Sequence, residues 1–190
     1  IIYDTMWNST RRMAECIAEG LRETDPTLTV KLFNSAVDDK NDIVTEVFKS
    51  KAILVGSPTI NYGFLFSIGG IMEMIRGLKF KNKKAAAFGS YGWSGEAVKQ
   101  ITALLQGAGF DVVNDGLRCQ WNPDQATQET CRQYGRDFAA AVNASEAKED
   151  GVQTELGDYN NDEQIGKAAK EHFEDWEKDA REGVKGGYAG

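Results

Sequence analysis

A short run of hydroxyl and amide side chains near the start of the chain has the chemistry of an anion-binding loop. The first N–H groups of a helix lack partners inside the helix, and the helix dipole adds partial positive charge there. A strand-to-helix junction of this composition therefore favours phosphate binding without a Lys or Arg side chain. A helix cap is the alternative, but it explains one such residue better than four. This run lies between apolar residues 1–3 and a helical pattern that begins at Arg11, and it contains Thr5, Met6, Trp7, Asn8, Ser9 and Thr10.

Two later loops combine aromatic residues with glycine, directly after apolar strands. Loop aromatics have little core to fill, so they suit contact with a flat apolar ligand. The alternatives are surface aromatics packed over helix starts and glycines that only permit turns. The first loop holds Ser57, Pro58, Thr59, Ile60, Asn61, Tyr62 and Gly63, and the second holds Ser90, Tyr91, Gly92, Trp93, Ser94 and Gly95.

Hydrophobic periodicity predicts the elements that carry these loops. In the segments expected to be helical, an apolar residue recurs every three or four positions along the chain. Continuous apolar runs are typical of buried parallel strands. The pattern predicts strands over 1–4, 28–33, 52–56 and 85–89 and a strand region over 110–120, with helices over 11–23, 42–49, 66–76, 95–108 and 124–142.

This alternation of strands and helices predicts an α/β fold of the flavodoxin-like type. We expect a three-layer sandwich with a five-stranded parallel sheet, order 2-1-3-4-5, and helices on both faces. Ligands of such sheets bind beyond the carboxyl ends of the strands. All three loops follow strands, so we expect them to meet at one edge.

One phosphate and one flat ring system describe flavin mononucleotide (FMN). A dinucleotide fits less well, because the first loop lacks the Gly-x-Gly-x-x-Gly pattern, and the lysine of a Walker loop is also absent.

The three loops resemble those of the flavodoxin family, and most closely the flavodoxin domain of flavodiiron proteins, the A-type flavoproteins that include nitric oxide reductase flavorubredoxins. Ser-Tyr-Gly-Trp-Ser-Gly is the most specific segment, whereas the phosphate loop ends in Asn-Ser-Thr in place of Thr-Gly-Asn-Thr. The resemblance implies that residues 5–10 hold the phosphate and ribityl groups. It also implies that Pro58, Thr59, Asn61, Tyr62 and Gly63 line one side of the ring, and Ser90, Tyr91, Gly92, Trp93 and Gly95 the other.

Charge and composition restrict the other functions. A net charge of −7 disfavours a nucleic-acid partner, and no apolar run is long enough to span a bilayer. The cysteines, Cys16, Cys119 and Cys131, lack metal-site spacing and are expected to be reduced thiols. Since His172 is the sole histidine, we expect no histidine-rich metal centre. These features predict a cytoplasmic protein.

The last part of the chain is more polar than the rest. We expect an FMN-binding domain over residues 1–142, with its N-terminus truncated and the family's upstream diiron domain absent. Residues 143–190 are expected to form an acidic linker and an amphipathic C-terminal helix over 162–181.

The resemblance implies a domain that passes electrons from a rubredoxin-type or flavin-reductase-type donor to a diiron centre that reduces oxygen or nitric oxide. This fragment alone is then an electron carrier, and the full-length parent a homodimer. The alternatives are a free-standing flavodoxin, an FMN-dependent NAD(P)H:quinone oxidoreductase, and a partner-binding module with no redox role.

Overall fold

Apolar segments form one parallel sheet at the centre of the described fold. The computed structural model describes residues 1–149, with side chains to residue 144. The strand order is β2-β1-β3-β4-β5, and β6 also pairs with β4, all in parallel. The strands are β1 (Ile2–Tyr3), β2 (Phe33–Asn34), β3 (Ala52–Gly56), β4 (Lys84–Tyr91), β5 (Asp111–Val112) and β6 (Leu117–Gln120). The predicted fold class and strand order are confirmed.

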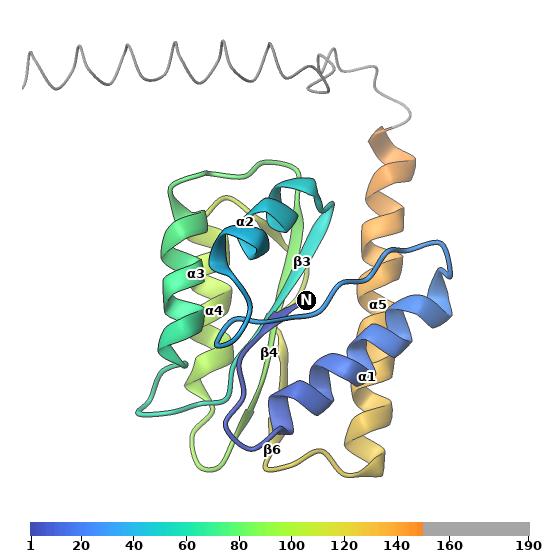
Figure 1. The fold of residues 1–190 in the computed structure, drawn as a ribbon. Helices are drawn as coiled ribbons and strands as arrows, with labels where there is room; N and C mark the ends of the chain where they lie inside the picture. Colours follow the sequence, from blue (N-terminus) through green and yellow to red (C-terminus); the bar gives the residue numbers. More distant parts are fainter. Residues whose placement is uncertain (150–190) are drawn as a thin grey trace, which may run out of the picture. The chain divides into compact units, whose positions relative to one another are not determined.

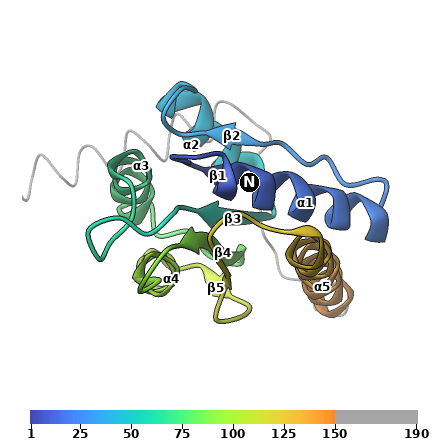
Figure 2. The same cartoon turned by 90° about the horizontal axis from the view of Figure 1, so that it is seen from below.

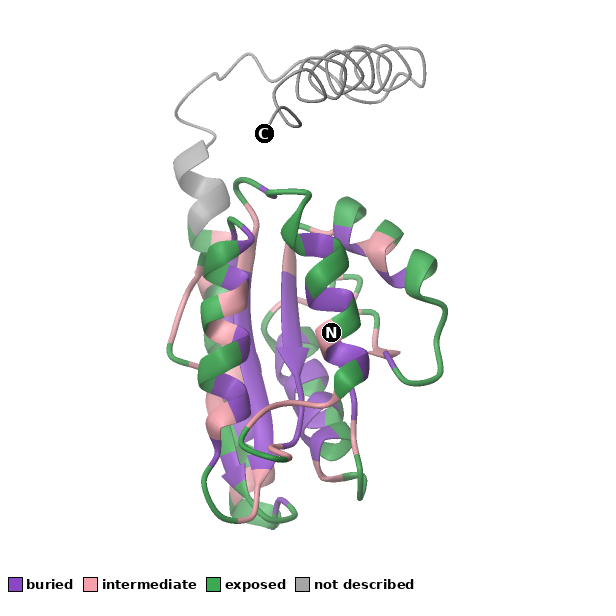
Figure 3. Ribbon diagram, turned by 90° about the vertical axis from the view of Figure 1, so that its left-hand side faces the viewer, coloured by how far each residue is buried: buried purple, intermediate pink, exposed green. Residues whose placement is uncertain are grey.

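Helices cover both faces of the sheet (Figures 1 and 2). One core cluster joins α2, α3 and α4 to one face, and a second joins α1 and α5 to the other. Strands β1, β3 and β4 between them are buried along nearly their whole length (Figure 3). The helices are α1 (Ser9–Thr24), α2 (Lys40–Lys49), α3 (Phe66–Arg76), α4 (Glu96–Gly107) and α5 (Gln125–Glu149).

Two strand predictions were wrong in extent. Strand β2 is confined to Phe33–Asn34 because those residues pair with the two residues of β1. The alternating residues Leu28, Val30 and Leu32 still pack on the core, but without strand pairing. The predicted strand region 110–120 is divided into β5 and β6, with Gly116 between them in a left-handed conformation at φ 87°.

Helix α5 continues past residue 142, the predicted end of the domain, to Glu149. The expected amphipathic helix over 162–181 and most of the expected linker lie outside the described residues. Within residues 1–149, no helix has both the length and the apolar composition needed to cross a membrane.

Candidate functional site

The loops after β1, β3 and β4 lie together at the carboxyl end of the sheet, which Figure 2 views directly. The hydroxyl of Ser90 joins two of them, because its oxygen lies 2.8 Å from that of Ser9 and 3.1 Å from that of Thr10. The carbonyl of Ser90 accepts a hydrogen bond of 2.8 Å from the N–H of Thr59. One residue therefore connects all three loops.

The loop after β1 holds unpaired hydrogen-bond donors. The N–H groups of Met6, Trp7 and Asn8 bond to no other described residue, and the buried hydroxyl of Thr5 has no partner. Asn8 occupies the N-cap position of α1 at φ 60°, yet its side chain makes no capping hydrogen bond. Helix capping therefore does not account for Asn8. Buried polar groups are normally paired, so these groups are ready to receive an acceptor.

Ser9 and Thr10 differ from the rest of this loop. Their hydroxyls already contact Ser90, and Thr10 is fully buried. Both residues belong to the first turn of α1, whose earliest helical hydrogen bond runs from Arg12 N–H to Asn8 O. Their backbone N–H groups thus remain available, as at other helix N-termini.

The loop after β3 ends in a tight turn stabilised by its own backbone. Ile60 and Gly63 exchange hydrogen bonds of 3.0 and 2.8 Å, and the two residues between them, Asn61 and Tyr62, both have positive φ, at 49° and 58°. This conformation leaves the Tyr62 side chain 76% exposed. Gln100 of α4 fixes the turn by donating 2.7 Å to the carbonyl of Tyr62.

The base of that loop is structural. Ser57 is fully buried, and its hydroxyl donates to Pro58 O and accepts from Leu65 N–H. Pro58 is also buried. The hydroxyl of Thr59 accepts a 3.3 Å bond from Ala97 N–H at the start of α4. Ser57 therefore supports the loop from beneath rather than offering a free hydroxyl.

The loop after β4 presents Trp93 at its tip, 90% exposed. Gly95 is needed behind it, since its φ is 79° and a Cβ atom there would lie 3.1 Å from the Tyr91 ring. Gly92 lies under another aromatic ring, because a Cβ atom at this position would lie 3.0 Å from the ring of Trp121. Ser94, the neighbour of Trp93, is exposed.

Trp121 belongs to this cluster and was missed by the sequence analysis. It follows β6, its N–H donates 2.8 Å to Tyr91 O, and its ring meets that of Trp93 edge-on at 5.5 Å. The signal was present in the sequence, because an aromatic residue follows the strand region 110–120 just as Trp93 follows its strand. The loop after β6 is thus a fourth loop of this cluster, and it packs against the tip of the loop after β4.

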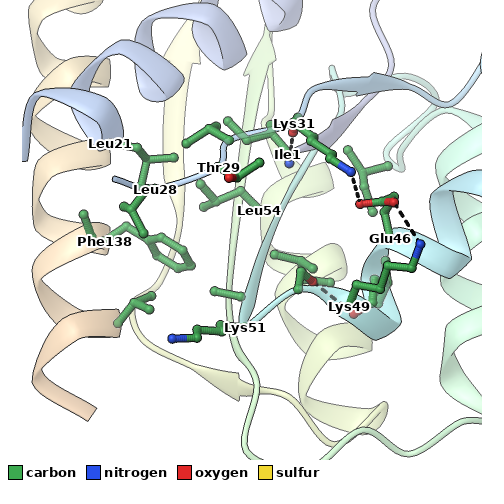
Figure 4. A pocket seen from close by; sticks show the side chains of 18 of the residues that line it. Ile1, Leu21, Leu28, Thr29, Lys31, Glu46, Lys49, Lys51, Leu54 and Phe138 are labelled. Atoms are coloured by element: carbon green, nitrogen blue, oxygen red, sulfur yellow. Dashed lines mark hydrogen bonds and ion pairs between the residues drawn. The ribbon is translucent and has the colours of Figure 1, made fainter. Parts of the chain in front are cut away.

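The cavity shown in Figure 4 lies elsewhere, at the amino end of the sheet. It encloses about 560 Å³ between the starts of β1 and β3 and the ends of α1, α2 and α5. Lys31 bridges to Glu46 at its rim. Ligands of parallel α/β sheets bind at the carboxyl end, so this cavity is not the candidate site.

Comparison with known proteins places this arrangement among flavin-binding folds. A sequence profile of the family described as flavodoxin matches residues 1–135. The anaerobic nitric oxide reductase flavorubredoxin of Escherichia coli O1:K1 is 51% identical over 139 residues, which cover 73% of this chain and 29% of that protein. The chain therefore spans less than a third of the length of this relative.

Two solved structures illustrate the likeness. Rubredoxin oxygen:oxidoreductase from Desulfovibrio gigas superposes with a TM-score of 0.71 at 37% identity, covering 75% of this chain and 35% of that one. A flavodoxin from the domain Archaea superposes with a TM-score of 0.66 at 29% identity, covering 75% of this chain and 96% of that one. The likeness thus extends over a whole small flavodoxin and over one part of a larger oxidoreductase.

Proposed function

The chain belongs to the flavodoxin family, and from this membership we propose that residues 1–142 bind FMN at the carboxyl end of the sheet and carry electrons. Membership implies a flavin cofactor. The observation that carries the choice of FMN is the set of three loops joined at Ser90, one with unpaired donors and two with aromatic residues. The donors match one phosphate, and the aromatic residues match one flat ring.

The residues present fit this cofactor. The Thr5 hydroxyl and the N–H groups of Met6, Trp7 and Asn8 would bind the phosphate, since their hydrogen-bonding capacity is unused. Tyr62 and Trp93 would cover the ring, because both are large, apolar in body and exposed at loop tips. When bound, FMN supplies the electron transfer itself. The protein contributes binding, orientation and exclusion of water from the ring.

The similar proteins support a more specific proposal for the parent of this domain. Their names include a nitric oxide reductase, an oxygen oxidoreductase and a flavodiiron protein. We propose that the domain receives electrons from a rubredoxin-type or flavin-reductase-type donor and passes them to a diiron centre, in a homodimeric parent. Residues 143–190 would serve as a linker to a further element.

An anaerobic redox titration tests the electron-carrier role. The purified chain is loaded with FMN, freed of excess cofactor and mixed with a rubredoxin that has been reduced beforehand. We expect the rubredoxin to reduce the bound flavin, with negligible reduction by NADH alone. Rapid turnover of NADH with a quinone would contradict this role and favour a quinone reductase. A chain that retains no flavin would contradict the proposed cofactor.

A further inference from the structure

A buried carboxylate lies directly behind the loop proposed to bind phosphate. Asp4 follows β1, is 6% exposed, and immediately precedes Thr5. Burying a carboxylate is costly unless its oxygens accept hydrogen bonds. An acid in this position also repels a bound phosphate. Its presence therefore requires an explanation that the proposed function does not give.

Both carboxylate oxygens of Asp4 have donors from different elements. Oδ1 accepts a 2.6 Å bond from the N–H of Thr5, and Oδ2 accepts the hydroxyl of Ser67 in the first turn of α3. The N–H of Asp4 donates 3.1 Å to Gly56 O, at the end of β3. Asp4 thus ties the start of the loop to a strand and to a helix.

A third buried residue extends this network. The hydroxyls of Ser67 and Ser35 lie 2.9 Å apart, and Ser35, which follows β2, bonds through its N–H to Tyr3 O. Ser35 and Ser67 are 3% and 4% exposed. Fully satisfied buried networks of this kind restrict local conformation.

The network determines which donors of the loop remain free. The Thr5 N–H is occupied by Asp4, which fixes the peptide between the two residues, while the Thr5 hydroxyl and the next three N–H groups stay unpaired. We propose that Asp4 is a positioning residue for phosphate: held by Ser67, it fixes the entry of the loop so that these donors converge on a phosphate monoester. This inference rests on the proposed binding of FMN.

The test compares FMN with riboflavin, which lacks the phosphate. Dissociation constants are measured by flavin fluorescence for the wild type, Asp4→Ala, Asp4→Asn and Ser67→Ala. We expect Asp4→Ala to weaken FMN binding about tenfold, the loss typical of a hydrogen bond to a charged group, and to leave riboflavin binding nearly unchanged. Asn can accept from Thr5 N–H and donate to Ser67, so Asp4→Asn should restore most of the FMN affinity.

Asp38→Asn is the matched control for charge. Asp38 is an exposed acid beyond β2 whose carboxylate accepts from Asn34 N–H at 2.6 Å. Removing its charge should leave the FMN-to-riboflavin ratio unchanged. If Asp38→Asn shifts the ratio as far as Asp4→Ala does, or if Asp4→Asn binds FMN as weakly as Asp4→Ala, the positioning role is wrong.

Two further outcomes are decisive. Equal weakening of both ligands by Asp4→Ala would mean a general structural role and would overturn the inference. If Asp4→Ala fails to fold by circular dichroism, Ser67→Ala decides, because it removes the anchor of Oδ2 together with the contact to Ser35, keeps the carboxylate, and should still weaken FMN selectively. A wild type that binds neither ligand would refute the proposed function, a result distinct from wild-type binding with an unchanged ratio in the variants.

Discussion

At the scale of residues, the site combines satisfied and unsatisfied polar groups in adjacent positions. Ser90, Ser9 and Thr10 bond to one another and hold the loops together. Thr5 has a buried hydroxyl without a partner in the described structure. An unpaired buried hydroxyl lowers stability, and a bound ligand that accepts its hydrogen bond would remove that cost at Thr5.

Thr5→Val separates these two roles. Valine keeps the shape of threonine and removes the unpaired hydroxyl, so we expect the flavin-free protein to gain about 1 kcal/mol in unfolding free energy and FMN binding to weaken about tenfold. Urea denaturation and fluorescence titration measure the two effects. The control is Thr102→Val in α4, which removes a second hydroxyl that is buried and unpaired among the described residues. It should gain stability with unchanged FMN affinity, and weaker FMN binding in that control would refute the explanation.

The buried thiols predict an alkaline loss of stability. Burial raises the pKa of Cys131 from 9.0 to about 12, with smaller contributions from Cys16 and Cys119. Above pH 9 the unfolded chain loses this proton while the folded protein keeps it, so unfolding free energy falls with rising pH until about pH 12. We expect the wild type to lose about 1 kcal/mol more than Cys131→Ala between pH 9 and pH 10, and less between pH 8 and pH 9, measured by urea denaturation at pH 8, 9 and 10. Equal slopes in the two proteins would contradict this assignment.

At the scale of elements, α1 and α5 approach closely at two glycines. A Cβ atom on Gly20 of α1 would lie 2.0 Å from Arg132 O, and one on Gly135 of α5 would lie 2.2 Å from Ile17 O. Since the nearest atoms belong to the backbone, no flexible side chain could move aside to make room for an added Cβ atom. These glycines therefore set the distance between the two helices that cover one face of the sheet.

Alanine at Gly135 tests this contact. We expect Gly135→Ala to lower unfolding free energy by about 1–3 kcal/mol, the usual cost of overpacking. Gly70→Ala in α3 is the matched control, because a Cβ atom there has nothing within 4 Å. It should raise stability by about 0.5–1 kcal/mol through helix propensity. Thermal or urea denaturation compares the two, and a stabilising Gly135→Ala would show that the helices can separate at low cost.

Hydrophobic periodicity predicted an element correctly where the spacing of its apolar residues reflects which of its faces is buried. Helix α3 begins and ends at the predicted residues 66 and 76, since its apolar stripe faces the sheet. The extent of β2 and the division of β5 from β6 depend on which residues pair across strands, which periodicity does not encode. In the site, loop position followed from strand order, whereas the contact of Trp121 with Trp93 and the Asp4 network depend on side chains brought together by tertiary folding.

At the scale of the whole described fold, the two ends of the sheet differ in chemistry. The carboxyl end carries the three loops that meet at Ser90, and the amino end carries the cavity of about 560 Å³. The unpaired donors and the exposed aromatic residues lie at the carboxyl end. Membership of the flavodoxin family also favours this end as the cofactor site. We propose that this end holds one FMN molecule.

Native mass spectrometry of the purified chain after incubation with FMN and removal of the excess tests that claim most directly. We predict a single adduct with the mass of one FMN, which releases FMN on denaturation and is depleted in the Thr5→Val variant. A chain that stays at its apoprotein mass, or that retains riboflavin as readily as FMN, would contradict the account.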